Sequence, residues 1–338
     1  MTTAASSSLT SAFAPLDAGA EVVSVTFLDG APVFALADGR LLFAGAGAPR
    51  SIQAHADAAI LVAASDGHRF ITGGDDGRVV VTDADGASET VADEKGKWID
   101  AVAARTDGTI AWSAGRRLNA RSPKGEVKTL ELPSSSRGIA FFPKGYRLAA
   151  AHYNGVSLWF PNAAAKPEFL EWKGSHLDVT VSPDGKFVMT SMQENMLHGW
   201  RLAGAKNMRM AGYPGKTRSL SWSHDGKWLA TSGADACIVW PFQAKDGPMG
   251  QSPRECGVRP EVKVTRVAFH PTALVVALGY EDGMVLLCRI TDGSEILVRR
   301  PDEGAPARIS ALAWDEKGAR LAVGAETGAA GVLTLPGG

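Results

Sequence analysis

The sequence predicts an all-β fold built from repeated sheets of short strands, and three observations support this prediction. Apolar and polar residues alternate in runs of about 5–7 residues, which is the pattern of a half-buried strand. No window of a dozen residues outside the loops shows helical spacing. Turn pairs that end in glycine recur about every 41 residues from Gly30 to Gly318. A fixed period of this length indicates a repeat protein.

Each repeat reads as four strands joined by tight turns. In the copy that begins at Thr217, the strand "RSLSWS" is followed by a turn at Asp225-Gly226 and the strand "KWLATSG". A second turn at Asp235 leads to "CIVWPF", and most copies add a fourth strand such as "EVKTLEL" or "KNMRM". Four antiparallel strands in about 41 residues are typical of one blade of a β-propeller.

We expect one domain over residues 1–338 that contains eight four-stranded blades, with seven blades as the alternative. The last copy has only three strands, so we expect residues 9–17 to pair with it as the outer strand and close the ring. Residues 1–8 are expected to be disordered. The eight copies begin near Glu21, Ala58, Trp98, Ser136, His176, Thr217, Val264 and Ala307.

At this point the sequence resembles the WD40-repeat family. The segments "VSPDGKFVMTSMQENMLHGW" and "WSHDGKWLATSGADACIVW" are similar to the family pattern, and strands end at Trp159, Trp200 and Trp240. None of these tryptophans is followed by the family's Asp, so the repeats are degenerate. The resemblance implies a buried structural network around His55 and His176, which we expect to be incomplete in most blades. It also implies a scaffold that binds proteins.

The bulk composition excludes several classes of function. The net charge is −1 and the pI is about 6.7, so no global field attracts nucleic acid or an anionic membrane. Cys237, Cys256 and Cys288 are far apart and form no C-x-x-C pair, which favours reduced thiols. No secretory signal or membrane-spanning run is present. We therefore expect a cytoplasmic protein, and a monomer.

No motif of catalysis or cofactor binding is found, so we expect neither an enzyme nor a cofactor. Gly215-Lys216-Thr217 looks like the end of a phosphate-binding loop, but position 210 is Met where that loop needs Gly. No G-x-S-x-G or H-E-x-x-H segment occurs. The side chains of Ser, His and Asp are too scattered for a catalytic triad to be proposed.

An alternative function is the binding of a small molecule in the central channel or of a soft metal ion by blades four and five. Histidines fall in adjacent copies there, near several methionines, and imidazole with thioether suits an ion such as Cu(I). Structural histidines and gap-filling methionines are the other interpretation of this pattern. The residues are His152, His176, His198, Met192, Met196, Met208 and Met210.

The leading hypothesis is a non-enzymatic interaction scaffold that binds a protein, or an acidic or phosphorylated peptide. The loops that lead into first strands gather on one face around the channel, and Arg can bind carboxylate or phosphate in a bidentate way. Trp98 is the natural aromatic anchor. The alternative interpretation is that these charged residues form a solvated rim that binds no partner. An error of one residue in the predicted register would also place these side chains on the other face of the sheet. The candidate residues are Trp98, Asp100, Arg137, Lys216, Arg218, Lys263 and Arg308.

Overall fold

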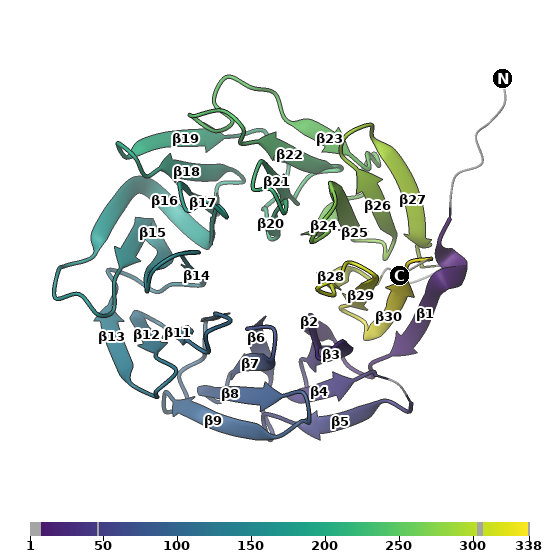
Figure 1. Ribbon diagram of the computed structural model, residues 1–338, viewed down its shortest axis with the longest axis horizontal. Coiled ribbons are helices and arrows are strands. Elements are labelled where there is room, and N and C mark those ends of the chain that lie inside the picture. Colours follow the sequence, from purple (N-terminus) through teal and green to yellow (C-terminus); the bar gives the residue numbers. More distant parts are fainter. Residues whose placement is uncertain (1–7, 46, 303–306, 337–338) are drawn as a thin grey trace. The chain divides into compact units, whose positions relative to one another are not determined.

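Strands make up nearly all the regular structure of the protein (Figure 1). The computed structural model describes residues 8–45, 47–302 and 307–336. In these residues there are thirty strands and one short 3-10 helix, η1 (Thr10–Ala12), and no α-helix. The prediction of an all-β fold is therefore confirmed.

The chain divides into two compact units. We name residues 33–216 the central unit and residues 1–32 with 217–338 the terminal unit. The expectation that residues 1–338 form a single domain stays a prediction.

The central unit begins with three sheets whose strands follow one another in chain order. The first continues a sheet that β2 (Val22–Leu28) of the terminal unit begins. Each hairpin joins neighbouring antiparallel strands, as alternating sequences with Gly turns favour. The strands are β3 (Ala31–Leu36), β4 (Arg40–Phe43) and β5 (Arg50–Gln53); then β6 (Ile60–Ser65), β7 (Arg69–Gly74), β8 (Arg78–Asp83) and β9 (Ser88–Asp93); then β10 (Ala101–Ala104), β11 (Ile110–Ala114), β12 (Arg117–Arg121) and β13 (Val127–Glu131).

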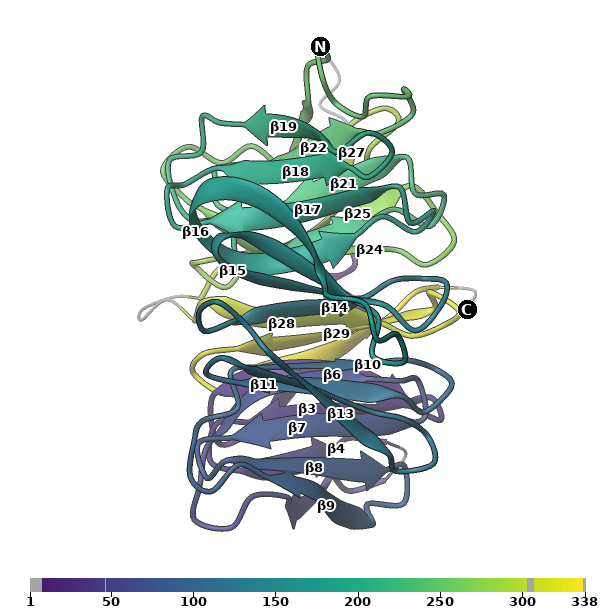
Figure 2. The ribbon, with the colours of Figure 1, turned by 90° about the vertical axis from the view of Figure 1, so that its left-hand side faces the viewer.

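The repeats expected from residues 136 and 176 share one six-stranded sheet, whose long strands β15 and β16 are visible in Figure 2. The first part of β16 pairs with β15, and its second part pairs with β17. The segment "EWKGSHLDV" contains the pair Lys173-Gly174, but Gly174, with φ of 133°, lies within β16 and does not end the strand. The strands are β14 (Gly138–Phe141), β15 (Leu148–Trp159), β16 (Glu168–Val181), β17 (Phe187–Met192), β18 (Leu197–Arg201) and β19 (Lys206–Met210).

This shared sheet corrects the expected number of blades. Counted as hydrogen-bonded sheets, the described residues form seven blades and not eight: six sheets have four strands and one has six. The count of eight assigned a separate sheet to each of the eight sequence copies. Because β16 runs from one repeat into the next, two repeats contribute to a single sheet.

The terminal unit contains three complete four-stranded sheets. Two of them follow chain order, and the third is formed by both ends of the chain, in the order β1-β30-β29-β28. The strands are β20 (Leu220–Trp222), β21 (Trp228–Thr231), β22 (Cys237–Pro241) and β23 (Arg254–Cys256); then β24 (Val264–Phe269), β25 (Val275–Tyr280), β26 (Val285–Arg289) and β27 (Ser294–Arg299); then β28 (Ile309–Trp314), β29 (Arg320–Ala325), β30 (Ala329–Thr334) and β1 (Phe13–Asp17).

The N-terminal segment supplies the fourth strand of the last sheet. In antiparallel register Phe13 lies opposite Leu333, and Asp17 lies opposite Ala329. The strand is shorter than the expected residues 9–17 because residues 10–12 form η1. That this pairing closes a ring of blades stays a prediction. Of the expected disordered segment 1–8, residues 1–7 lie outside the described residues, whereas Ser8 forms a bridge with Leu297.

Burial falls from the second strand of a sheet to its outer strand. In β7, β25 and β29 every residue after the first is buried, whereas the outer strand β13 alternates between exposed and half-buried residues. A strand covered on both faces needs a continuous apolar run, and an outer strand needs only one apolar face. The core therefore lies between the sheets.

First strands in the terminal unit are joined by side-chain hydroxyls. The Ser219 hydroxyl accepts a hydrogen bond from the Val267 N–H at 3.0 Å, and the Thr265 hydroxyl donates to the Ile309 carbonyl at 2.7 Å. Close packing adds to this: a Cβ on Gly279 would lie 2.4 Å from a methyl carbon of Ile309. These contacts hold the starts of the first strands, and the loops that precede them, in fixed positions.

Candidate functional site

All seven candidate residues lie in loops that lead directly into first strands, which we name the leading loops. Trp98 and Asp100 precede β10, and Arg137 precedes β14, in the central unit. Lys216 ends the central unit. Arg218, Lys263 and Arg308 precede β20, β24 and β28 in the terminal unit. The structure thus gives two groups of leading loops, one in each unit.

Trp98 is the most exposed large apolar side chain that the structure describes, at 63%. Its neighbour Ile99 is fully buried and donates its N–H to the Gly74 carbonyl at 3.1 Å. A Cβ on Gly73 would lie 2.4 Å from the Ile99 side chain, so only glycine at position 73 leaves room for the isoleucine. Since successive side chains of an extended segment point to opposite sides, burial of Ile99 turns Trp98 outward.

Asp100 holds the loop in place. Its Oδ2 accepts the Gly115 N–H at 2.7 Å, and its own N–H donates to the Ser113 carbonyl at 2.8 Å. The Gly115 carbonyl accepts the Ser136 N–H from the next leading loop at 3.1 Å. Gly115 is therefore hydrogen-bonded to both leading loops, the one before β10 and the one before β14. One carboxylate oxygen of Asp100 already accepts a hydrogen bond within the fold.

Arg137 and Tyr153 add a free cation and a second aromatic ring to these loops. Arg137 is exposed, and the described residues include no ion pair or side-chain hydrogen bond for it. Tyr153 is 55% exposed, and its N–H donates to Ser134 Oγ at 2.9 Å. We name Trp98, Arg137 and Tyr153 the central-unit surface. Sequence reasoning missed Tyr153, although its place just before the Asn154-Gly155 pair signals a hairpin end.

The basic residues of the terminal unit are closer to acidic groups. Arg308 Nη1 lies 3.3 Å from Glu326 Oε1, and the Lys263 N–H donates to Glu281 Oε1 at 2.9 Å. Arg218 is exposed. An exposed ion pair weakens the field that a distant anion would experience. The charge of the Arg308 side chain is therefore partly neutralised by Glu326.

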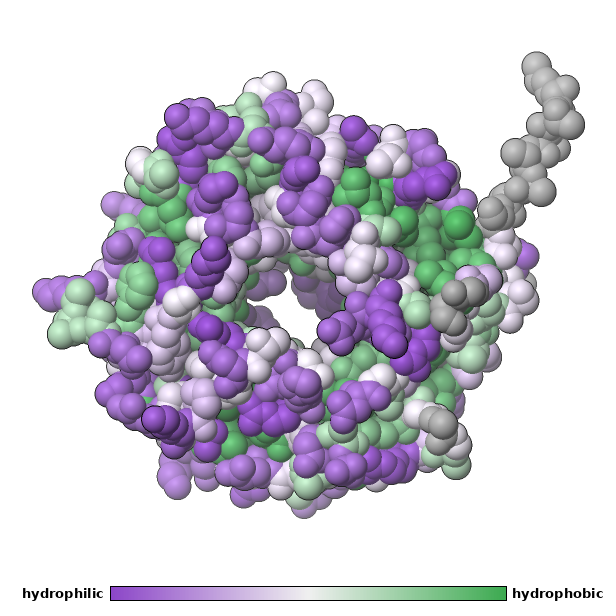
Figure 3. Space-filling model, viewed as in Figure 1, coloured by the Kyte–Doolittle hydropathy of each residue, from purple (hydrophilic) through white to green (hydrophobic). Residues whose placement is uncertain are grey.

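The face drawn in Figure 3 is mixed in character. In Figure 3 hydrophilic residues cover much of the face drawn, with smaller groups of hydrophobic residues between them. Because this face has no large uniform patch, we expect any binding to depend on single exposed aromatic residues with a charged neighbour. Residues of these types contribute most of the binding energy at interfaces.

The histidines of the alternative metal hypothesis are buried in the central unit. His152 hydrogen-bonds to Ser157 Oγ at 2.8 Å and to the Tyr153 carbonyl at 2.9 Å. His176 hydrogen-bonds to Thr190 Oγ1 at 2.7 Å and to the Trp172 carbonyl at 3.0 Å. Both rings therefore use both nitrogens within the fold.

His198 is different, because neither ring nitrogen has a hydrogen-bond partner among the described residues. The ring stacks on Trp172 with centroids 4.0 Å apart and meets Trp200 edge-on at 4.6 Å. Burial lowers the pKa of His198 to about 3. The described residues contain no group of three His, Cys, Asp or Glu side chains placed to hold a metal ion. The soft-metal alternative stays a prediction without a ligand set.

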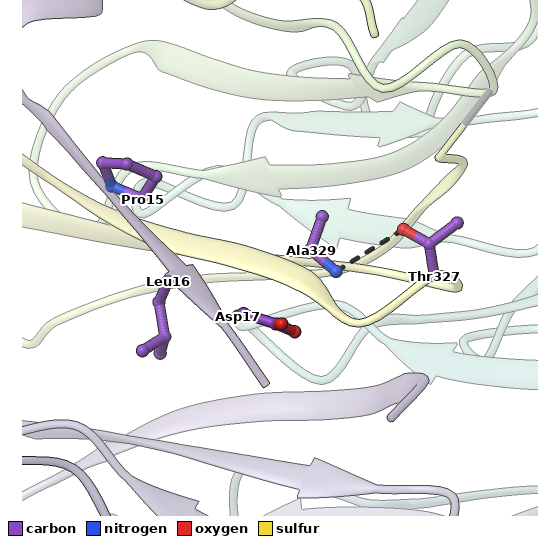
Figure 4. Close-up of a pocket in the computed structure, with 5 residues that line it drawn as sticks. All are labelled: Pro15, Leu16, Asp17, Thr327 and Ala329. Atoms are coloured by element: carbon purple, nitrogen blue, oxygen red, sulfur yellow. Dashed lines mark hydrogen bonds between the residues drawn. The ribbon is translucent and has the colours of Figure 1, made fainter. Parts of the chain in front are cut away.

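A shallow hollow lies beside β1 and β30, in the last sheet of the terminal unit (Figure 4). Pro15, Leu16 and Asp17 line one side, and Thr327 and Ala329 line the other. The Ala329 N–H donates to Thr327 Oγ1 at 3.4 Å. A small-molecule site needs several converging polar groups, and these five residues contribute a single carboxylate.

The structural network around His55 is nearly complete. Its Nδ1 lies 3.2 Å from both carboxylate oxygens of Asp76, and its Nε2 lies 2.9 Å from Thr72 Oγ1. In the later repeat, His176 contacts Thr190 and Trp200 in place of an Asp. The network therefore uses a different subset of partners in each of these two repeats.

Two family models match the chain. The model of the WD domain, G-beta repeat, matches residues 208–240, and that of the anaphase-promoting complex subunit 4 WD40 domain matches residues 260–336. These two matches lie in the second half of the chain and support a WD40-repeat β-propeller. WD40 propellers generally bind protein partners, and they are generally non-enzymatic.

The fold is also similar to a solved structure. The crystal structure of the computationally designed Ika8 protein superposes on this chain with a TM-score of 0.78. The match covers 95% of this chain and 98% of the designed chain, at 16% sequence identity. At that identity the likeness shows the fold alone. No curated protein matches the sequence.

Within the described ranges, no helix has the length and apolar character needed to cross a bilayer.

Proposed function

We propose that this WD40 protein is a non-enzymatic interaction scaffold that binds a protein through an acidic or phosphorylated segment on its leading loops. The observation that carries the proposal is the central-unit surface, where an exposed Trp98 and an unpaired Arg137 stand on hydrogen-bonded loops. A rigid loop that already displays its aromatic anchor loses little conformational entropy on binding. One matched model is named for a WD40 domain in a multi-protein complex, which is in keeping with this role.

Acidic chemistry of the partner is supported by the groups that are free to bind it. Arg137 offers a planar guanidinium that fits carboxylate or phosphate, and exposed Lys97 adjoins Trp98. Asp100, the nearby acid, is held by Gly115. We therefore rank Trp98 and Arg137 above Lys216, Arg218, Lys263 and Arg308 as binding residues.

A quantitative pull-down tests this proposal. Full-length protein and the variant Trp98→Ala/Arg137→Glu are used as baits in extract from the native cell, with and without phosphatase treatment. We expect at least one partner to be lost by roughly tenfold or more with the variant, as is usual for hot-spot residues. Loss after phosphatase treatment would assign the phosphorylated form of the segment.

The control is Lys124→Glu, which makes the same change of charge as Arg137→Glu but lies at the far end of the sheet β10–β13, whose first strand follows Trp98. Lys124 is exposed in the β12–β13 turn, and the register places that turn opposite the leading loops. Partner lists that are identical for the wild type and Trp98→Ala/Arg137→Glu would contradict the proposed surface.

A further inference from the structure

A buried carboxylate in the central unit joins the sheet β6–β9 to the sheet β10–β13. Glu94 directly follows β9, and its N–H donates to the Gly77 carbonyl at 2.8 Å. Its side chain reaches β11 and β12, where Oε1 accepts hydrogen bonds from Trp112 Nε1 at 2.8 Å and from Asn119 Nδ2 at 3.0 Å. Oε2 accepts a hydrogen bond from Arg117 Nη1 at 3.1 Å.

These contacts require a carboxylate at position 94. Glu94 is 8% exposed, and charged side chains are seldom buried to this extent unless they are paired. The Thr129 hydroxyl donates to Asn119 Oδ1 at 2.7 Å, so the amide of Asn119 has its donor end free for Glu94. A glutamine at position 94 would accept at one end only, and its NH₂ group would face the guanidinium of Arg117.

Glu94 occupies the place in its repeat that His55 occupies in the preceding repeat. Each of the two residues lies five positions before a buried isoleucine of the segment that leads into the first strand. His55 contacts the carboxylate of Asp76 at 3.2 Å, whereas Glu94 contacts the guanidinium of Arg117 at 3.1 Å. The basic and the acidic partner have therefore exchanged positions between the two repeats.

The loop that Glu94 begins is the loop that displays Trp98. The Lys97 N–H donates to the Glu94 carbonyl at 3.3 Å. A Cβ on Gly77 would lie 2.9 Å from the Lys97 carbonyl oxygen, so the loop packs directly on the hairpin between β7 and β8. Because the buried Ile99 fixes the other end of the loop, the attachment of Glu94 determines the path of the residues between them.

We propose that Glu94 is a positioning residue for the central-unit surface. Its carboxylate fixes the point at which the loop leaves β9, and thereby the direction in which the exposed Trp98 side chain meets the partner. As a buried residue, Glu94 acts through Trp98 and not by contact with the partner. The inference deepens the proposed function, on which it rests for any effect on binding.

Fluorine NMR of the full chain labelled with 5-fluorotryptophan tests the position of Trp98 without a partner. The Trp98 resonance is the one that is missing from the variant Trp98→Phe. In Glu94→Gln we expect this resonance to shift, because the new amide cannot accept a hydrogen bond from Arg117. In the pull-down, Glu94→Gln should capture the partner that depends on Trp98 with a yield lower by roughly threefold or more.

The matched control is Glu131→Gln, the same substitution on β13 of the same sheet. The Glu131 carboxylate is 60% exposed and lies 3.3 Å from Arg116 Nε, so its loss should leave the Trp98 resonance in place. Arg117→Gln is a second variant, which removes only the Oε2 contact from a side chain that is 46% exposed. It should shift the same resonance, and it decides the question if circular dichroism shows that Glu94→Gln is not folded.

The outcomes separate this inference from the proposed function. A Trp98 resonance that stays unchanged in Glu94→Gln and Arg117→Gln would overturn the inference, and so would an equal shift in Glu131→Gln. Full capture by folded Glu94→Gln of a partner that Trp98→Ala/Arg137→Glu loses would also overturn it, while the scaffold function would stand. If Trp98→Ala/Arg137→Glu loses no partner, the scaffold function fails, and the fluorine spectra still decide if Glu94 positions Trp98.

Discussion

At the residue scale, His198 is the most unusual side chain of the central unit. It is fully buried, and its two ring nitrogens lack partners among the described residues. An unsatisfied buried polar group costs about 1–3 kcal/mol. Stacking on Trp172 and the edge contact with Trp200 offset part of this cost. The imidazole ring therefore packs like an aromatic core side chain, while its two nitrogens make no hydrogen bond among the described residues.

This environment predicts a loss of stability in mild acid. Because the pKa of His198 is about 3 in the folded protein and 6.5 in the unfolded chain, the unfolded chain binds the proton more readily below pH 6.5. Stability falls as the pH drops from 6.5 towards 3, by about 2 kcal/mol at pH 5. His198→Phe should remove this contribution and raise the free energy of unfolding at pH 7 by about 1 kcal/mol.

Urea unfolding of both proteins at pH 7 and pH 5 measures this effect. Burial also lowers the pKa of His55, His152 and His176, so the variant keeps some dependence on pH in the same direction. An equal difference between the two pH values in the wild type and in His198→Phe would show that His198 is not the cause.

At the element scale, β1 and β16 show how much of the strand order follows from local signals. The pairing of an N-terminal strand with the last repeat could be predicted because that repeat has only three strands. The shared sheet could not, because a strand that continues through Gly174 looks like two strands separated by a loop. Only the register of β16 with both β15 and β17 reveals it.

Deletion of residues 1–17 tests the role of β1. The deletion removes the antiparallel pairing from Phe13 to Asp17 and leaves the outer edge of β30 unpaired. We expect the Tm to fall by roughly 5 °C or more and the protein to self-associate through the free edge. Differential scanning calorimetry and size-exclusion chromatography measure the two effects.

The control is a deletion of residues 1–7, which leaves η1 and β1 in place. If the longer deletion has the Tm and elution volume of the full chain, β1 contributes nothing to the last sheet.

At the scale of the whole molecule, the balance of charge predicts weak contact with nucleic acid. A net charge of −1 gives no long-range attraction to phosphate, and many acidic and basic groups are paired with each other. A fluorescent 20-base-pair DNA should therefore show no change in anisotropy at 0.15 M salt up to roughly 10 µM protein. Saturable binding with a Kd below about 1 µM would contradict this.

The candidate surface shows what could be inferred before the structure and what could not. Trp98 and Arg137 follow from their place before first strands, because the repeat period fixes where those strands begin. The engagement of Asp100 by Gly115, the Arg308–Glu326 ion pair and the exposure of Tyr153 depend on neighbouring loops. No spacing in one chain encodes these contacts.

The sequence by itself determined the all-β repeat, the four-strand unit and the position of the leading loops, because turn chemistry and alternating hydrophobicity act over a few residues. Tertiary structure decided that two repeats share a sheet through β16 and that His198 stacks on Trp172. It also decided that Cys237, Cys256 and Cys288 meet in one core. These features join residues distant along the chain, and packing between strands and sheets alone selects them.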